Sequence, residues 1–419
     1  MLTRLLRRRV GASGRSDASQ DAPEDPLTPP ERPRAPRPGD AFTPTRPQRS
    51  ARRFVGRRVE FERIRQALEE DRAHVAIYGE RGRGKTSLVN LVVEAMRANG
   101  HMVARHTCGS GSDFEQIMRG LARDLPRQFL AVPSADASAT EGAEAALPAG
   151  PVSPRDVATL PARLAGGHLV LVLDEFDRVV SERTRIRVSE AMKQASDRGA
   201  PLSIVLVGVA DSVEQLLGGH AIIRRNLVRV PLPLLTDAEI EEIVAGGAED
   251  CGIAFPPAAR MVIARIARGV PHVAHLLSLR AAQAAVAHDA SLVGRGDLWA
   301  AVDRMIEEAD AATADQYEAL TTRGQDLAAM RCSSVTAAAP QDAFGRFSLD
   351  EPSPPGPVHV GGVPLPAEEW DHLLAARVFR RSTGGVAFAN PELQTYLLLR
   401  AASGYAAMRR IGSESGTLR

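Results

Sequence analysis

Residues 74–90 read HVAIYGERGRGKTSLVN, and this stretch decides the fold. It opens with a short apolar run, His74–Tyr78, passes through a glycine-rich turn and ends in a helical pattern. The turn, Gly79–Thr86, fits G-x-x-x-x-G-K-[ST] at every fixed position, and strand, turn and helix are the context which that pattern requires. The sequence therefore predicts a phosphate-binding loop; the alternative is a chance glycine turn before a helix.

The residue types in this loop predict how it would hold ATP. The glycines let the backbone turn tightly, so that N–H groups converge on phosphate oxygens, and the following helix points its positive end at the same anion. Lys85 would reach the β- and γ-phosphates, and the Thr86 hydroxyl would ligate Mg²⁺. The predicted nucleotide-binding residues here are Gly79, Glu80, Arg81, Gly82, Arg83, Gly84, Lys85, Thr86 and Ser87.

Composition supports the role of Lys85. The chain has 52 basic residues, and Lys85 and Lys193 are its two lysines. A random basic position in this chain would almost always be arginine, yet a lysine stands where a compact ammonium group is needed.

Charge and cysteine usage exclude several classes of protein. The net charge of 419 residues is +1, and residues 1–53 carry 12 arginines against 6 acids, so the rest is slightly acidic. This balance argues against a large nucleic-acid surface. The three cysteines lie far apart without a C-x-x-C, which fits neither a disulfide framework nor a zinc site and predicts a reducing, cytoplasmic location. No apolar run approaches 18 residues, so we expect no membrane span.

The chain order predicts an α/β fold, a doubly wound parallel-sheet P-loop ATPase domain with an all-α lid and a C-terminal winged-helix domain. Strands alternate with helices up to Pro233, and a purely helical pattern follows. We expect a disordered Arg/Pro-rich tail at 1–53, the α/β nucleotide-binding domain at 54–235, the lid at 236–312, the winged-helix domain at 313–410 and a tail at 411–419.

Several local expectations can be checked directly. We expect a helix at 112–129 with Ser112 as N-cap and Glu115 completing a capping box, and a mobile insertion at 131–153. The lid should hold four helices, at 237–245, 257–267, 271–288 and 295–310. The C-terminal part should hold a helix at 316–330, a loop-rich stretch to Pro366, a helix at 367–377, a hairpin at 378–389 and a helix at 391–402.

A second motif, His168–Asp177, reads HLVLVLDEFD. Its apolar residues predict a buried parallel strand, and ligands bind outside the carboxyl ends of such strands. Asp174 is suited to hold Mg²⁺ and Glu175 to polarise the attacking water. The alternative is two acids in a solvated turn. Asp177 fits a helix cap equally well.

These motifs support a resemblance to a known family. Residues 54–310 resemble the AAA+ ATPases, and within them the origin-recognition and replication-initiator group with its bacterial relatives among transposition and secretion ATPases. The residues that carry the likeness are FVGR (54–57), GERGRGKT (79–86), LVLVLDEFD (169–177), VLVGVADS (205–212) and RRNLVRVPLP (224–233). A C-terminal winged helix fits that group too.

The resemblance implies further site residues. Val55 and Gly56 match the segment that lines the adenine pocket. Asp211 stands where the family places a polar sensor of the γ-phosphate, usually Asn; an Asp would repel the phosphate unless it is protonated or paired with a cation, and a helix N-cap is the alternative.

Two further assignments rest on the same resemblance. Arg224 and Arg225 match the arginine-finger region, or are two surface arginines. His272 occupies the place of a second-sensor arginine, or is a partly exposed histidine at a helix start.

Two functions remain open at this stage. The first is an ATP-driven switch that acts on a protein partner through the winged helix, with ATP and ADP as ligands and a possible homo-oligomer as the active form. The second is a DNA-bound ATPase of replication-initiator or transposition-helper type. The helix expected to enter a DNA groove, 367–376, carries three acids and no arginine, which disfavours DNA. Arg377, Arg380 and Arg381 near the wing keep DNA possible.

Overall fold

The computed structural model describes most of the chain beyond residue 36. The described residues are 37–44, 46, 54–126, 129, 143–165, 167–218, 226–321, 326–351, 356–382 and 384–415. The predicted tail at 1–53 therefore lies largely outside the described residues, as does the segment 219–225.

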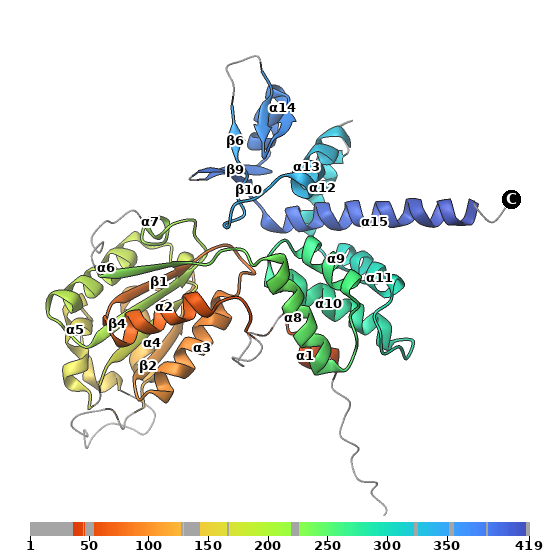
Figure 1. Ribbon diagram of the computed structural model, residues 1–419. Helices are drawn as coiled ribbons and strands as arrows, with labels where there is room; N and C mark the ends of the chain where they lie inside the picture. Colours follow the sequence, from red (N-terminus) through yellow and green to blue (C-terminus); the bar gives the residue numbers. More distant parts are fainter. Residues whose placement is uncertain are drawn as a thin grey trace, which may run out of the picture. The chain divides into compact units, whose positions relative to one another are not determined.

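A five-stranded parallel sheet forms the centre of the nucleotide-binding part (Figure 1). Its order is β2-β3-β4-β1-β5, and every neighbouring pair is parallel. The fold class predicted from the sequence is thereby confirmed. The strands are β1 (His74–Tyr78), β2 (Met102–Thr107), β3 (Leu169–Asp174), β4 (Leu202–Gly208) and β5 (Leu227–Pro231).

The sheet separates two apolar cores. Along β3, Leu169, Leu171 and Leu173 face one core while Val170 and Val172 face the other, as the period of two in a strand requires. Helices α2 (Arg58–Glu69) and α3 (Lys85–Ala98) cover the valine side. The leucine side is covered by α4 (Phe114–Asp124), α5 (Pro154–Thr159) and α6 (Glu182–Asp197).

Two local predictions in this part are wrong. The N-cap of α4 is Asp113, whose carboxylate accepts from Gln116 in a capping box, one residue after the predicted Ser112 and Glu115; Ser112 Oγ instead accepts from the Gly109 N–H. The second half of the expected mobile insertion is packed, because Leu147 and Val152 are buried in the leucine-side core. The first half, 131–142, lies outside the described residues.

Four helices follow β5, as predicted: α8 (Asp237–Cys251), α9 (Pro257–Ala267), α10 (Pro271–Val286) and α11 (Arg295–Glu307). We call this part, residues 236–310, the lid. Helix α8 does not end at residue 245. It runs through Gly246 and Gly247 and stops where Gly252 adopts a left-handed conformation. Gly247 is needed for packing, because a Cβ there would lie 2.1 Å from Phe42.

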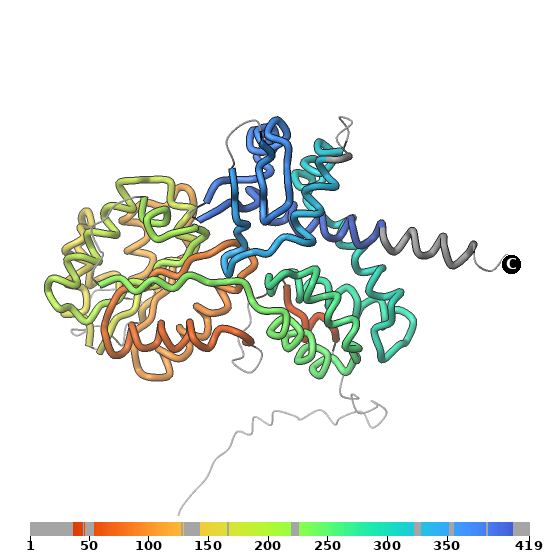
Figure 2. Tube along the Cα trace, turned by 45° about the horizontal axis from the view of Figure 1, so that its top comes forward, coloured from red at the N-terminus to blue at the C-terminus, as the bar shows by residue number. Residues whose placement is uncertain are grey.

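The N-terminal segment corrects the tail prediction. A short helix, α1 (Pro38–Ala41), lies beside α8 of the lid (Figure 2). Phe42, the next residue, packs into the lid core. Phe42 is fully buried and its ring meets Phe255 edge-on at 5.6 Å. A single aromatic in a Pro- and Arg-rich stretch carries no periodicity, so the sequence pattern gave no sign of this anchor.

Removing the Phe42 ring should destabilise the lid. A large-to-small change at a fully buried aromatic costs about 3–5 kcal/mol, so we expect Phe42→Ala to lower the midpoint of thermal unfolding. Deleting residues 1–50 should do the same, whereas deleting residues 1–36 should not. Thermal unfolding of the three variants beside the full chain makes the comparison. Equal midpoints for both deletions would mean that the Phe42 contact contributes nothing to stability.

The C-terminal region, residues 311–415, has its own apolar core. The expected helix at 316–330 is two helices, α12 (Ala311–Thr321) and α13 (Asp326–Ala338), and the expected loop-rich stretch holds a small antiparallel sheet of β6 (Leu349–Asp350), β7 (Val358–Val360) and β8 (Val363–Leu365). Next come α14 (Ala367–Ala375), the antiparallel hairpin of β9 (Phe379–Ser382) and β10 (Gly385–Phe388), and α15.

Helix α15 (Pro391–Ser415) runs past both the predicted end at 402 and the start of the predicted tail at 411. Among the described helices, none is long and apolar enough to cross a membrane. Cys108, Cys251 and Cys332 are buried free thiols.

Candidate functional site

The phosphate loop, Gly79–Thr86, joins β1 to α3 as the sequence predicts. Gly84 is the N-cap of α3 and has φ +87°, a left-handed conformation that suits glycine. Gly82 has φ +75°, and a Cβ there would lie 2.9 Å from a methyl group of Val270 and 3.2 Å from His272. Glycine at position 82 therefore lets the loop approach the first turn of α10 in the lid closely.

Lys85 lies under this loop. Its ammonium group donates to the carbonyl oxygens of Gly79 and Glu80, each at 2.8 Å. Burial lowers the pKa of Lys85 to about 8, and the nearby Glu80 carboxylate opposes that shift. These two hydrogen bonds hold the ammonium group at the loop where phosphates would bind. Its partial burial lowers the local dielectric constant, which strengthens its attraction to an anion.

A cavity of about 350 Å³ opens beside the loop and brings together most of the predicted site residues. It is large enough for a nucleotide. The predicted residues that line it are Val55, Arg81, Gly82, Arg83, Gly84, Lys85, Thr86, Ser87, Asp174, Glu175 and His272. Gly56, Gly79, Glu80 and Asp211 lie outside its lining.

Asp174 ends β3 inside this cavity and is buried. One carboxylate oxygen accepts from the backbone N–H of Glu175 at 2.9 Å, and the other pairs with Arg105 of β2. Arg105 also bonds Asn90 of α3. The Asp174 carboxylate and the Thr86 hydroxyl line the same cavity, and these two oxygen donors suit a hard cation such as Mg²⁺. No group of three or more metal-ligating side chains occurs in the described part of the chain.

Glu175 follows Asp174 in a left-handed conformation, with φ +53°. A non-glycine residue there costs of order 1 kcal/mol, and such outliers gather at functional sites. Its carboxylate pairs with Arg178 at 2.6 Å, and the side chain is 46% exposed. A role as general base requires that Glu175 leave Arg178 and approach water, which its exposure permits.

Asp177 and Asp211, for which a helix cap was the alternative, make other contacts in the structure. Asp177 accepts from the Val209 N–H at 2.8 Å and so links the ends of β3 and β4, where a helix cap was the alternative. Asp211 does not cap the next helix either, because Ser212 is the N-cap of α7 (Val213–Leu216). Asp211 instead forms an ion pair with Arg380 of β9.

His272 lies against the phosphate loop. Its backbone N–H donates to the Gly82 carbonyl at 3.3 Å, and its ring Nδ1 lies 3.1 Å from the Pro44 carbonyl, to which it can donate. Pro44 and Thr43 line the same cavity. Sequence reasoning missed this N-terminal wall because it assigned the segment to a tail. His275, one turn on, packs edge-on against Phe42.

Two buried arginines make structural contacts that the sequence did not predict. Arg57, the last residue of FVGR, donates to the carbonyls of Pro233 (2.5 Å) and Arg83 (3.4 Å). Arg83 itself is buried and donates to the carbonyls of Leu232 (2.9 Å) and Phe344 (2.6 Å). Because arginine is so common in this chain, an arginine at position 57 or 83 does not stand out as a structural residue. Position 83 is also a variable place of the phosphate-loop motif, so the motif predicts no residue type there. Arg224 and Arg225 lie outside the described residues.

The comparisons with known proteins agree with this geometry. Residues 53–210 match the family model described as the AAA ATPase domain. The matched segment includes the phosphate loop, Asp174 and Glu175. This part of the chain is therefore an AAA ATPase domain, the class of domain that binds and hydrolyses ATP, and the resemblance to the AAA+ ATPases is confirmed for these residues.

One solved structure shares this fold, and two others are similar over most of the chain at lower TM-scores. A Walker-type ATPase of Pyrococcus abyssi is 14% identical with a TM-score of 0.52, over 85% of this chain and 99% of that chain. The RuvB Holliday junction branch migration motor of Thermotoga maritima is 16% identical (TM-score 0.46; 84% and 97%). The Aeropyrum pernix ORC1 protein, in complex with DNA, is 15% identical (TM-score 0.45; 89% and 98%). No curated protein matches the chain.

Proposed function

We propose that this protein is a Mg²⁺-dependent ATPase whose nucleotide state is transmitted to the C-terminal region, which acts on a protein partner. The observation that carries the proposal is the set of contacts from the phosphate loop to that region. Arg83 donates to the Phe344 carbonyl, and Glu80 pairs with Arg380. A change in the conformation of the phosphate loop would therefore alter contacts that the C-terminal region makes directly.

The residues of the cavity fit the chemistry. Lys85 and the N–H groups at the start of α3 bind and orient the phosphates, and Thr86 with Asp174 would hold Mg²⁺. When bound, Mg²⁺ neutralises charge on the β- and γ-phosphates. Glu175 accepts a proton from the attacking water. Val55, Pro44 and His272 also line the cavity, and the base and ribose would lie against these residues.

The charge distribution favours a protein partner over DNA. The order of α14 and the β9–β10 hairpin suits the proposed winged-helix domain, in which α14 would be the reading helix. Glu368, Glu369 and Asp371 make that helix acidic. Of the hairpin arginines, Arg380 pairs with Asp211 and Glu80, and Arg381 pairs with Glu351. Paired guanidinium groups are poorly placed to release counterions from DNA phosphates.

Hydrogen exchange and DNA titration separate the two functions. With MgATP in place of MgADP, we expect altered amide protection at 342–346 and 379–388, because these segments contact the phosphate loop. Duplex DNA at about 50 mM salt, a condition that favours phosphate contacts, should not bind measurably by fluorescence anisotropy. Tight DNA binding that weakens steeply with salt, without any nucleotide effect on exchange, would instead support the DNA-bound ATPase.

Hydrolysis should also need a second protomer, with Arg224 or Arg225 supplied across the interface. A permanently charged, planar guanidinium suits the charge that develops on the transferring phosphoryl group. We therefore expect specific activity to rise with protein concentration. The Arg224→Ala, Arg225→Ala double variant and Glu175→Gln should each be weakly active, and mixing them should recover part of the activity. Activity that is independent of concentration, with no recovery on mixing, would leave both arginines without a catalytic role.

A further inference from the structure

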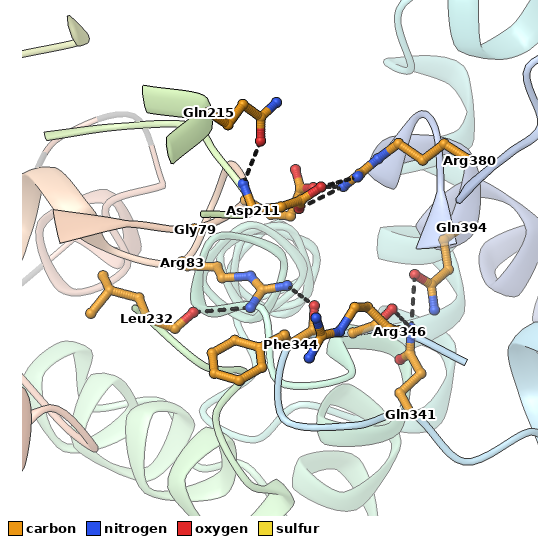
Figure 3. A network of polar contacts seen from close by, with 12 residues as sticks. Gly79, Arg83, Asp211, Gln215, Leu232, Gln341, Phe344, Arg346, Arg380 and Gln394 are labelled. Atoms are coloured by element: carbon orange, nitrogen blue, oxygen red, sulfur yellow. Dashed lines mark hydrogen bonds and ion pairs between the residues drawn. The ribbon is translucent and has the colours of Figure 1, made fainter. Parts of the chain in front are cut away.

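Arg380 joins the C-terminal region to two segments of the nucleotide-binding part, and Figure 3 shows it beside Asp211. Arg380 extends from β9 of the C-terminal region, and its guanidinium group pairs with Asp211 and with Glu80. All three side chains are half-buried, with exposed fractions of 30%, 29% and 23%. One cation therefore faces two carboxylates, both in the nucleotide-binding part.

The sheet order places Asp211 at the same edge of the sheet as the phosphate loop. Strand β4 lies between β3 and β1. Asp211, three residues beyond the end of β4, thus follows a strand flanked by Asp174 and Glu175 on one side and by the phosphate loop on the other. Glu80 belongs to that loop, and its carbonyl accepts from Lys85. Without a cation, two carboxylates would stand near the triphosphate and repel it.

We propose that Arg380 is a positioning residue of the ATP site, supplied by the C-terminal region, which neutralises Asp211 and so allows the site to accept a γ-phosphate. This inference rests on the proposed ATPase function. Because the γ-phosphate is absent from ADP, Arg380 favours ATP over ADP. The reverse coupling follows by linkage: ATP stabilises the docked position of the hairpin more than ADP does.

A second contact holds the same surfaces together. Arg83 reaches the Phe344 carbonyl, and the Leu234 N–H donates to the Ala343 carbonyl at 2.6 Å. On the lid side, Arg268 donates to Gln341 at 3.0 Å and to the carbonyls of Thr336 and Ala339. The segment 336–346 is therefore held through neutral acceptors, which are backbone carbonyls and the Gln341 amide oxygen, and these carry the same charge in every nucleotide state.

A cavity separates the surfaces beside these contacts. It measures about 480 Å³, and Asp211 and Arg380 both line it. The surfaces are thus not close-packed around the ion pairs. Of the contacts described here, those of Arg380 join a cation to carboxylates, so they are the contacts that respond most to the charge of the nucleotide.

The test is calorimetric titration of the full chain with MgATP and with MgADP. Arg380→Ala leaves Asp211 unpaired, so the Kd for MgATP should rise about tenfold while that for MgADP changes less than about twofold, as expected for one repulsive carboxylate near the γ-phosphate. Asp211→Asn in the Arg380→Ala background should restore most of the ATP-to-ADP ratio, because the carboxylate that Arg380 neutralises beside the γ-phosphate is gone and only Glu80 remains. Arg380→Lys should keep part of the preference.

Arg381→Ala is the matched control. Arg381 is the next residue of β9, and its partner, Glu351, lies within the C-terminal region. This variant should keep the wild-type ratio. An unchanged ratio in Arg380→Ala, or no rescue by Asp211→Asn, would overturn the inference while wild-type MgATP binding stands. Absence of MgATP binding by the wild-type chain would overturn the proposed function itself.

Discussion

Lys85→Ala should abolish measurable MgATP binding. The ammonium group lies in the phosphate loop, held by the carbonyls of Gly79 and Glu80. Losing a charge-assisted contact to the phosphates costs about 3 kcal/mol, which weakens binding by more than about 100-fold. Isothermal titration calorimetry with the full chain measures this effect. Unchanged affinity in a folded variant would mean that the loop does not hold the phosphates.

The chain offers a matched control and a pH signature. Lys193, the other lysine, is exposed on α6, and Lys193→Ala should bind MgATP normally. Since the pKa of Lys85 is about 8 and phosphate favours the protonated amine, binding takes up a proton above that pH. The MgATP affinity should therefore fall about tenfold between pH 7 and pH 9. A flat profile in this window would place the phosphates away from Lys85.

Glu175→Gln should separate binding from turnover. The amide keeps the shape of the side chain and removes its basicity, so MgATP affinity should stay within a few-fold of wild type. Turnover should fall by about 10² to 10⁴, the usual contribution of a general base. The pair with Arg178 is weakened as well, but both side chains are half-exposed, so we expect little change in stability.

The control for Glu175 is a glutamate that lies elsewhere on the surface. Glu94 of α3 is exposed, and Glu94→Gln should retain both binding and turnover. Calorimetry and phosphate release, measured on the same preparations, give the two quantities. If Glu175→Gln lost affinity and turnover in equal proportion, Glu175 would be a structural residue of the site.

The strand, the phosphate loop and the helix starts were predicted well because each depends on the conformational preferences of neighbouring residues. The apolar run in Leu169–Asp174 and the glycines of the phosphate loop depend on short-range geometry, so the buried strand and the position of the loop followed from the residues themselves. Pro257 and Pro271 start helices, since proline suits the first turn. Asp174 and Glu175 lie at the cavity because the carboxyl ends of parallel strands meet at one edge.

Long-range contacts account for most of what sequence reasoning missed. Phe42 enters the lid core 205 residues before Gly247, the glycine that makes room for it. Asp211 meets Arg380 across 169 residues. The sequence analysis recognised that an Asp at position 211 needs a cation, but nothing local could name Arg380 among 50 arginines. The N-cap of α4 lies one residue after the predicted Ser112. Asp113 and Gln116 form a capping box with the same spacing as Ser112 and Glu115, so the pattern alone could not choose between them.

The central claim is that the cavity beside Lys85 hydrolyses ATP with Mg²⁺. A single-turnover assay tests it most directly, with the full chain in excess over radiolabelled ATP and phosphate release followed for hours, so that slow chemistry is visible. We predict complete conversion to ADP and phosphate with Mg²⁺, loss of conversion when the metal is chelated, and no conversion above background by Lys85→Ala. Conversion by wild type that is no faster than by Lys85→Ala, or that persists after chelation, would contradict the account.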